Sequence, residues 1–212
     1  MRSVLRIPSI VAAALLAGNL LAQSIDLPAP QKSGGMPLMD ALARRSTSRA
    51  FATNDLSAQQ ISSLLWAAFG INRPDGKRTA PSAMNRQEAE IYVLLPQGAY
   101  VYSAVSNRLD QVLAGDLREL GGTQSFVKDA PVTLVFVADL AKCGGNNEGS
   151  RNTANVDVGY ISQNVYLFCA SAGLATGARG SVDRTALGQK LKLRPEQLIV
   201  LAQSVGYPKA AN

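Results

Sequence analysis

The stretch Thr153–Gly180, TANVDVGYISQNVYLFCASAGLATGARG, predicts the longest helix of the chain, followed by a glycine-rich turn and a strand. The helix is expected over residues 153–172, and Gly173 is a typical residue for its C-cap. Apolar residues lie around most of its axis, so we expect the helix to be buried on several sides. These residues are Val156, Ile161, Val165, Leu167 and Phe168.

The sequence before this stretch predicts two helices and most of a sheet. Pro37 can occupy the first turn of a helix that runs to about Arg44. The residues Ser57-Ala58-Gln59-Gln60 form a capping box, which predicts a second helix that Gly70 stops. The other expected elements are a hairpin of residues 90–95 and 99–103, two short helices within 115–129, a central strand at 132–138 and a polar loop at 140–152.

After the stretch, Asp183 is expected to cap a short helix that runs to Leu191, and residues 197–205 predict a last strand. Strands that are separated by helices and include a hairpin indicate an α+β fold, with a mixed sheet surrounded by helices. We expect one domain over residues 36–212, preceded by a flexible arm at 23–35 that is rich in Pro, Gly and Ser.

Residues 1–22 are typical of a signal peptide. Arg2 and Arg6 supply the charged start, and residues 10–21 form an apolar run that is too short to span a bilayer. Cleavage is expected after Ala22, which gives an exported, periplasmic protein with no stable membrane insertion. An uncleaved membrane anchor is the alternative.

Two cysteines, Cys143 and Cys169, can form a disulfide in an oxidising compartment. Cys169 lies in an apolar helical pattern, where cysteine usually behaves as a small buried side chain. We therefore favour free thiols.

The composition excludes several classes of enzyme. The 212 residues include no histidine, which excludes Ser-His-Asp and Cys-His triads and the common zinc and iron sites that depend on histidine. We expect no metal, and a bound cofactor is the natural source of chemistry. The net charge is +6, but the mature part has no basic run, which argues against nucleic-acid binding.

Residues 44–49, RRSTSR, combine three arginines with three hydroxyl side chains just after a helix end. Arginine presents a planar fork to phosphate oxygens, and hydroxyls donate further hydrogen bonds. The segment is therefore a candidate phosphate site. The alternative is a solvated helix terminus whose cations offset the helix dipole.

Two later loops are candidates for contact with a ring. Residues 78–87 are rich in short polar side chains, and Asn or Gln can pair with the donor and acceptor edge of a ring such as a flavin's. An ordinary Pro-Ser turn is the alternative. Residues 173–180 contain three glycines, which let backbone approach a ligand closely. A helix C-cap that leads into a strand explains them equally well.

The order and spacing of these segments resemble the nitroreductase family. The resemblance covers residues 36–208 and is nearest to the branch whose dehydrogenases form thiazoles and oxazoles in peptides. The matching motifs are Arg44–Phe51, Pro81–Gln87, Asp157-Val158-Gly159 with Gln163-Asn164, Gly173–Thr176 and Val205–Pro208.

The resemblance implies an FMN site made of three groups of residues. The phosphate and ribityl chain would be bound by Arg44, Arg45, Ser46 or Thr47, and Arg49. The isoalloxazine ring would be lined by Pro81, Ser82, Ala83 and Asn85, and its far side by Leu174, Ala175, Thr176 and Gly177. Ser48 is an extra residue relative to the family motif, and Lys209 is the only candidate for a later basic phosphate ligand.

The resemblance also implies a homodimer with each flavin at the subunit interface. The implied reaction is hydride exchange between a reduced donor, for which NAD(P)H is a candidate, and a small organic acceptor such as a nitro compound or quinone. It assigns no catalytic side chain. The lysine-tyrosine pair of azoline oxidases has no clear match, so that activity is not expected here. An exported flavin carrier or sensor without turnover is the alternative.

Overall fold

A seven-stranded sheet organises the protein, and the computed structural model describes residues 23–210. Each neighbouring pair of described strands is antiparallel, where a mixed sheet was expected. In spatial order the strands are β1 (Ile25–Asp26), β4 (Arg108–Ala114), β3 (Gly98–Ser103), β2 (Ala89–Leu95), β5 (Val132–Asp139), β7 (Gln197–Gly206) and β6 (Ala175–Arg179).

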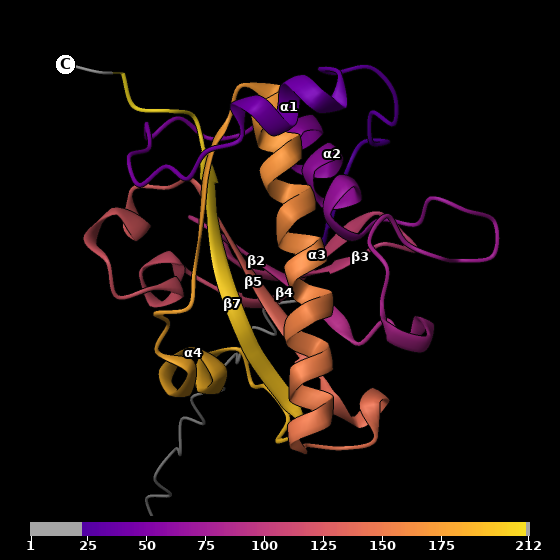
Figure 1. The fold of residues 1–212 in the computed structure, drawn as a ribbon. Coiled ribbons are helices and arrows are strands. Elements are labelled where there is room, and N and C mark those ends of the chain that lie inside the picture. The colour runs from indigo at the N-terminus through magenta and orange to yellow at the C-terminus, as the bar shows by residue number, and fades with distance from the viewer. Residues whose placement is uncertain (1–22, 211–212) are drawn as a thin grey trace, which may run out of the picture.

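Helices lie on both sides of this sheet, which confirms the expected α+β fold with its long helix (Figure 1). They are α1 (Leu38–Arg44), α2 (Ala58–Phe69), α3 (Glu148–Ala172) and α4 (Arg184–Lys190), with short 3-10 turns η1 (Ala83–Asn85), η2 (Arg118–Gly121), η3 (Ser125–Lys128) and η4 (Leu140–Cys143). Both α1 and α2 pack against α3, which runs across one face of the sheet.

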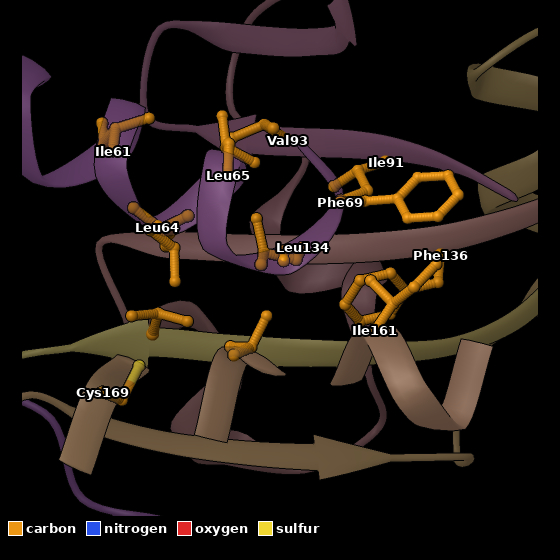
Figure 2. Packing of buried hydrophobic residues seen from close by; sticks show 14 of the residues in the cluster. Ile61, Leu64, Leu65, Phe69, Ile91, Val93, Leu134, Phe136, Ile161 and Cys169 are labelled. Atoms are coloured by element: carbon orange, nitrogen blue, oxygen red, sulfur yellow. The ribbon is translucent and has the colours of Figure 1, made fainter. Parts of the chain in front are cut away.

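The alternation of side chains along each strand divides the core into two layers. Ile91 and Val93 of β2 point toward α2 and α3, whereas Tyr92 and Leu94 point toward α4 and η2. Figure 2 shows the first layer, in which Leu64, Leu65 and Phe69 of α2 pack with strand residues and with Ile161 of α3. Every residue of β5 is buried because both layers cover this central strand.

Local signals set several element ends as predicted. The Ser57 Oγ accepts a hydrogen bond from the Gln60 N–H, and the Gln60 side chain accepts one from the Ser57 N–H, so the capping box is present. Asp183 Oδ1 accepts from the Ala186 N–H and caps α4. The expected hairpin is formed by β2 and β3, and the central strand by β5.

Three expectations about elements were wrong. The long helix begins at Glu148 rather than near residue 153, because Asn147 accepts from the Ser150 N–H and caps it within the expected loop. Strand β4 lies in a region for which no element was expected, and it extends the hairpin. The arm is not wholly irregular, since its residues 25–26 pair with β4 as β1.

Helix α3 is buried on one side rather than on several. Its sheet-facing residues Val158, Ile161 and Val165 are fully buried, but Val156 is 54% exposed and Tyr160 is 48% exposed. The core of one chain therefore does not bury all the apolar residues of α3. A strip of the helix with Val156 and Tyr160 remains exposed and could contact another chain.

Both cysteines are buried free thiols, as favoured from the sequence. Burial raises the pKa of Cys169, whose side chain belongs to the first core layer. The signal peptide expected at residues 1–22 lies outside the described residues. Among residues 23–210, none of the helices is both long and apolar enough to cross a membrane.

Candidate functional site

The arginine-rich segment that follows α1 is attached to the glycine-rich strand β6. The Ser48 N–H donates to the Thr176 carbonyl oxygen at 2.8 Å. A Cβ at Gly177 would lie only 2.5 Å from the Ser48 carbonyl oxygen, so the two backbones can approach this closely only because residue 177 is glycine. Two segments that are far apart in the sequence thus form one edge of a site.

A cavity of about 200 Å³ opens at this edge. The C-terminal half of α3, the turn into β6 and the chain end after β7 complete its walls. Its lining residues are Arg44, Ser46, Ser48, Tyr166, Ala170, Leu174, Ala175, Thr176 and Pro208. The structure therefore brings together the first and third groups of residues that the sequence singled out.

The three arginines occupy different positions around this cavity. Arg44 lines it, Arg45 stacks over the Tyr166 ring at 5.4 Å, and Arg49 is exposed outside it. Within residues 23–210, none of the three forms an ion pair with a carboxylate. Lys209 is held nearby through its backbone N–H, which donates to the Ala50 carbonyl oxygen. This edge of the protein therefore carries guanidinium groups that are free to bind an anion.

Tyr166 was not singled out from the sequence, although it organises the segment. Its hydroxyl accepts from the Ala178 N–H at 2.9 Å and lies 3.1 Å from Thr47 Oγ1. The Thr47 hydroxyl is therefore engaged with the protein, whereas Ser46 lines the cavity. An aromatic residue inside an apolar helical pattern gives no sequence signal that distinguishes this role from core packing.

The Pro81–Gln87 loop has a strained backbone that specific hydrogen bonds hold. Met84, Asn85 and Gln87 have φ values of 53°, 54° and 49°, in the left-handed region that costs non-glycine residues about 1–3 kcal/mol each. The Ala83 N–H donates to Asp157 Oδ2 at 2.8 Å, and the Gln87 N–H donates to the Ser82 Oγ at 3.0 Å. This anchoring indicates a loop that is kept in one shape.

A surface recess of about 550 Å³ lies between this loop and the N-terminal half of α3. It is lined by Pro81, Ser82, Ala83, Asn152, Thr153, Val156, Asp157 and Tyr160. Met84, at the tip of the loop, is 83% exposed. The loop thus presents backbone and short side chains to an open, partly apolar surface.

The structure does not bring this loop to the arginine-rich cavity within one chain. The loop contacts α3 at Asp157, whereas the cavity contacts it at Tyr166 and Ala170. At the helical rise of about 1.5 Å per residue, these contacts are roughly 14–20 Å apart along α3. The residues expected to form one site therefore form two half-sites, one along the N-terminal half of the helix and one along its C-terminal half.

Comparison with known proteins identifies the family. The model of the nitroreductase family matches residues 41–207. The chain belongs to the nitroreductase family. The family assignment from the sequence motifs is therefore confirmed, and it makes this nitroreductase-family protein an oxidoreductase by class.

Individual relatives agree with this assignment. A candidate nitroreductase of Methanocaldococcus jannaschii is 28% identical over 176 residues, which are 77% of this chain and 88% of that protein. The crystal structure of a candidate nitroreductase from Ralstonia eutropha has a TM-score of 0.85 and 35% identity, and the match covers 99% of this chain and 97% of that one.

A more distant structure shares the fold. The NADPH:FMN oxidoreductase of Vibrio harveyi has a TM-score of 0.62 and 17% identity, with 82% of this chain and 69% of that one covered. The α+β architecture is thus common to proteins whose sequences have diverged widely.

Proposed function

We propose that this nitroreductase-family protein is an exported FMN-dependent oxidoreductase. It would exchange hydride between a reduced donor, with NAD(P)H as the first candidate, and a small organic acceptor such as a nitro compound or a quinone. The observation that carries the proposal is the cavity edge where the guanidinium groups of Arg44 and Arg45, the Ser46 hydroxyl and the glycine-rich strand converge. The motifs resemble most closely those of the thiazole- and oxazole-forming branch, without its lysine-tyrosine pair.

The donor set at the cavity suits the phosphate of FMN. Arg44 and Ser46 line the cavity, and Arg45 lies on the Tyr166 ring beside it. Guanidinium groups and hydroxyls form short, charge-assisted hydrogen bonds to phosphate oxygens, and among residues 23–210 no carboxylate lines the cavity to compete. Of the two candidate hydroxyls, Ser46 is the better phosphate ligand because Thr47 is already bonded to Tyr166.

The Pro81–Asn85 loop suits the edge of the isoalloxazine ring. The hydrogen bond from the Ala83 N–H to Asp157 fixes the loop backbone, so the polar groups of the loop hold their positions before a ring binds. When bound, FMN supplies the hydride chemistry, and the protein supplies binding, orientation and exclusion of water. No histidine or other general base is required for these tasks.

Two copies of the chain are needed to join the half-sites. The exposed strip of α3, with Val156 and Tyr160, lies beside the loop, and α1 exposes Leu38 and Met39 near the other end of the helix (Figure 1). A two-fold axis across α3 would bury this apolar surface against its own copy. It would also bring the Pro81–Asn85 loop of one subunit toward the Arg44 cavity of its partner.

The proposal is tested by spectroscopy on the purified mature protein. We expect a yellow protein, or apo-protein that takes up FMN, whose flavin absorbance is bleached by NADH or NADPH and restored by a nitro compound or quinone. Protein that cannot be reconstituted with FMN would overturn the proposal. FMN binding without bleaching by any donor would instead support the exported carrier, which the expected signal peptide favours because nicotinamide cofactors are concentrated in the cytoplasm.

A further inference from the structure

A carboxyl group is buried directly behind the Pro81–Asn85 loop. Glu88 is fully buried, and neither of its carboxylate oxygens has a hydrogen-bond partner among the described residues. Its carbonyl oxygen accepts from the Asp139 N–H at 2.9 Å, at the point where β2 and β5 begin to pair. The backbone of Glu88 is therefore fixed at the edge of this strand pairing, and its side chain is held away from solvent.

Titratable groups from two elements face Glu88. The Asp157 carboxyl approaches it from α3, Lys142 and the Cys143 thiol approach it from η4, and Arg86 faces Cys143. Lys142 is exposed and donates to the Gln87 carbonyl oxygen, so it is not a dedicated partner of Glu88. Two neighbouring carboxyl groups in a buried site cannot both be ionised without a large cost.

A proton on Glu88 removes the repulsion between the two carboxylates and gives one of the two Glu88 oxygens a hydrogen bond to make. A buried polar oxygen without a partner is rare in native structures, and a neutral carboxylic acid has one O–H donor to offer. Asp157 is the adjacent acceptor, and its Oδ2 already accepts from the Ala83 N–H. Donation from Glu88 to Asp157 would leave one negative charge between the two groups and would orient the Asp157 carboxylate toward the loop.

We propose that Glu88 is a neutral carboxylic acid whose O–H donates a hydrogen bond to the Asp157 carboxylate, and that this pair positions the loop by holding Asp157 Oδ2 against the Ala83 N–H. The inference rests on the proposed function only in assigning this loop to the flavin ring. Glu88 is a positioning residue, since it acts on the loop through Asp157. The strained backbone at Met84 and Asn85 is the reason that the loop needs such an anchor.

The proposed pair makes the loop sensitive to alkaline pH. Burial raises the pKa of Glu88, and Asp157 raises it further, whereas the Glu88 backbone N–H and Lys142 oppose the shift. The neutral form is thus favoured in the folded state, and the anchor is complete below the raised pKa. As the pH rises through that value, a second negative charge appears beside Asp157 and the anchor weakens. Burial also raises the pKa of the Cys143 thiol, so it is neutral at neutral pH.

The experiment follows the Ala83 amide by NMR hydrogen exchange, with and without FMN, from acidic to alkaline pH. In the wild type we expect the protection factor to fall about ten- to hundredfold as Glu88 ionises, which is the size expected for losing a hydrogen bond to a charged group. Glu88→Gln stays neutral and still donates, so its protection should not change with pH. Glu90→Gln, two residues further along the chain in β2, should behave as the wild type.

The outcomes separate this inference from the proposed function. A pH dependence that persists in Glu88→Gln, or a carboxyl 13C shift showing Glu88 ionised at pH 7 in the wild type, would overturn the shared proton. The carboxyl measurement needs no variant, so it decides the matter even if Glu88→Gln fails to fold. Normal Ala83 behaviour in a protein that never binds FMN would keep the pair and remove the flavin assignment.

Discussion

The Ser48 N–H donates to the Thr176 carbonyl oxygen, and this 2.8 Å hydrogen bond joins the arginine-rich segment to β6. Beside it, Gly177 lies so close to the Ser48 carbonyl oxygen that no side chain fits between the two backbones. The relative position of the guanidinium groups and the glycine-rich strand is therefore set by backbone contacts. The shape of the cavity depends on those contacts as much as on its side chains.

Gly177→Ala should separate the segment from the strand. The added Cβ would lie 2.5 Å from a backbone oxygen, which cannot move without breaking the Ser48–Thr176 hydrogen bond. We expect a loss of about 1–3 kcal/mol in unfolding free energy, as for other overpacked sites, together with weaker FMN binding. Thermal melts and FMN titrations measure both effects.

Gly180→Ala is the matched control for this substitution. Gly180 follows the same strand, but a Cβ there meets nothing within 4 Å. Its stability and FMN affinity should equal those of the wild type. Equal behaviour of the two variants would show that the close approach at Gly177 is not needed.

Arg44→Ala should weaken FMN binding without changing riboflavin binding. Arg44 lines the cavity, so its loss removes a charge-assisted contact worth about 1.5–3 kcal/mol, or roughly ten- to hundredfold in affinity. Riboflavin lacks the phosphate and should bind Arg44→Ala and the wild type alike. Arg44→Lys should recover only part of the loss, because lysine cannot form the planar fork.

Arg49→Ala is the informative comparison for the phosphate site. Arg49 belongs to the family motif but is exposed outside the cavity, so we expect a smaller effect than at Arg44 or Arg45. Equal losses for FMN and riboflavin in any of these variants would indicate a folding defect. If none of the variants lost affinity for either flavin, the phosphate site would have to be assigned to other residues, and Lys209 would be the next to test.

The signal peptide expected at residues 1–22 predicts cleavage after Ala22. Its charged start and short apolar run are typical of exported proteins, so the mature chain should begin at Gln23. N-terminal sequencing of the native protein, after fractionation of the cells, measures the site and the compartment. A soluble cytoplasmic chain that still begins at Met1 would contradict this prediction.

Local signals in the sequence were sufficient for most of the fold. The capping residues Ser57 and Asp183 act through neighbours three residues away, so their effect can be read without knowledge of the tertiary structure. Strand β4 could not be recognised in this way, since its residues are mostly half-buried and only pairing with β3 defines it. The same applies to β1, which is a strand only because β4 lies beside it.

The candidate site was predictable as a set of residues but not as an arrangement. The motifs indicated Arg44, Ser46 and Thr176, and these do meet at one cavity. Sequence spacing could not reveal that the Pro81 loop contacts the N-terminal half of α3, because that contact depends on how the loop and the helix pack in three dimensions. Glu88 was equally hidden, since its burial, which the sequence does not show, is what distinguishes it from the nearby Glu90 of β2.

Val156→Lys should separate the proposed dimer and weaken flavin binding together. Val156 is 54% exposed on the open strip of α3, beside the Pro81 loop. In the proposed dimer, a lysine there would be buried against an apolar surface, and the lysine of the second subunit would lie across the same two-fold interface. Burying two charges without partners should raise the dimer dissociation constant about tenfold or more. Light scattering and FMN titration across protein concentrations measure the two effects.

Val105→Lys provides the control, because Val105 is 84% exposed on the turn between β3 and β4, away from α3. This variant should remain dimeric and bind FMN normally. If the two half-sites are joined only in the dimer, Val156→Lys should lose FMN affinity in proportion to its monomer fraction and recover it at high protein concentration. A monomeric Val156→Lys that binds FMN as tightly as the wild type would show that one chain is sufficient, and the two half-sites would then require separate explanations.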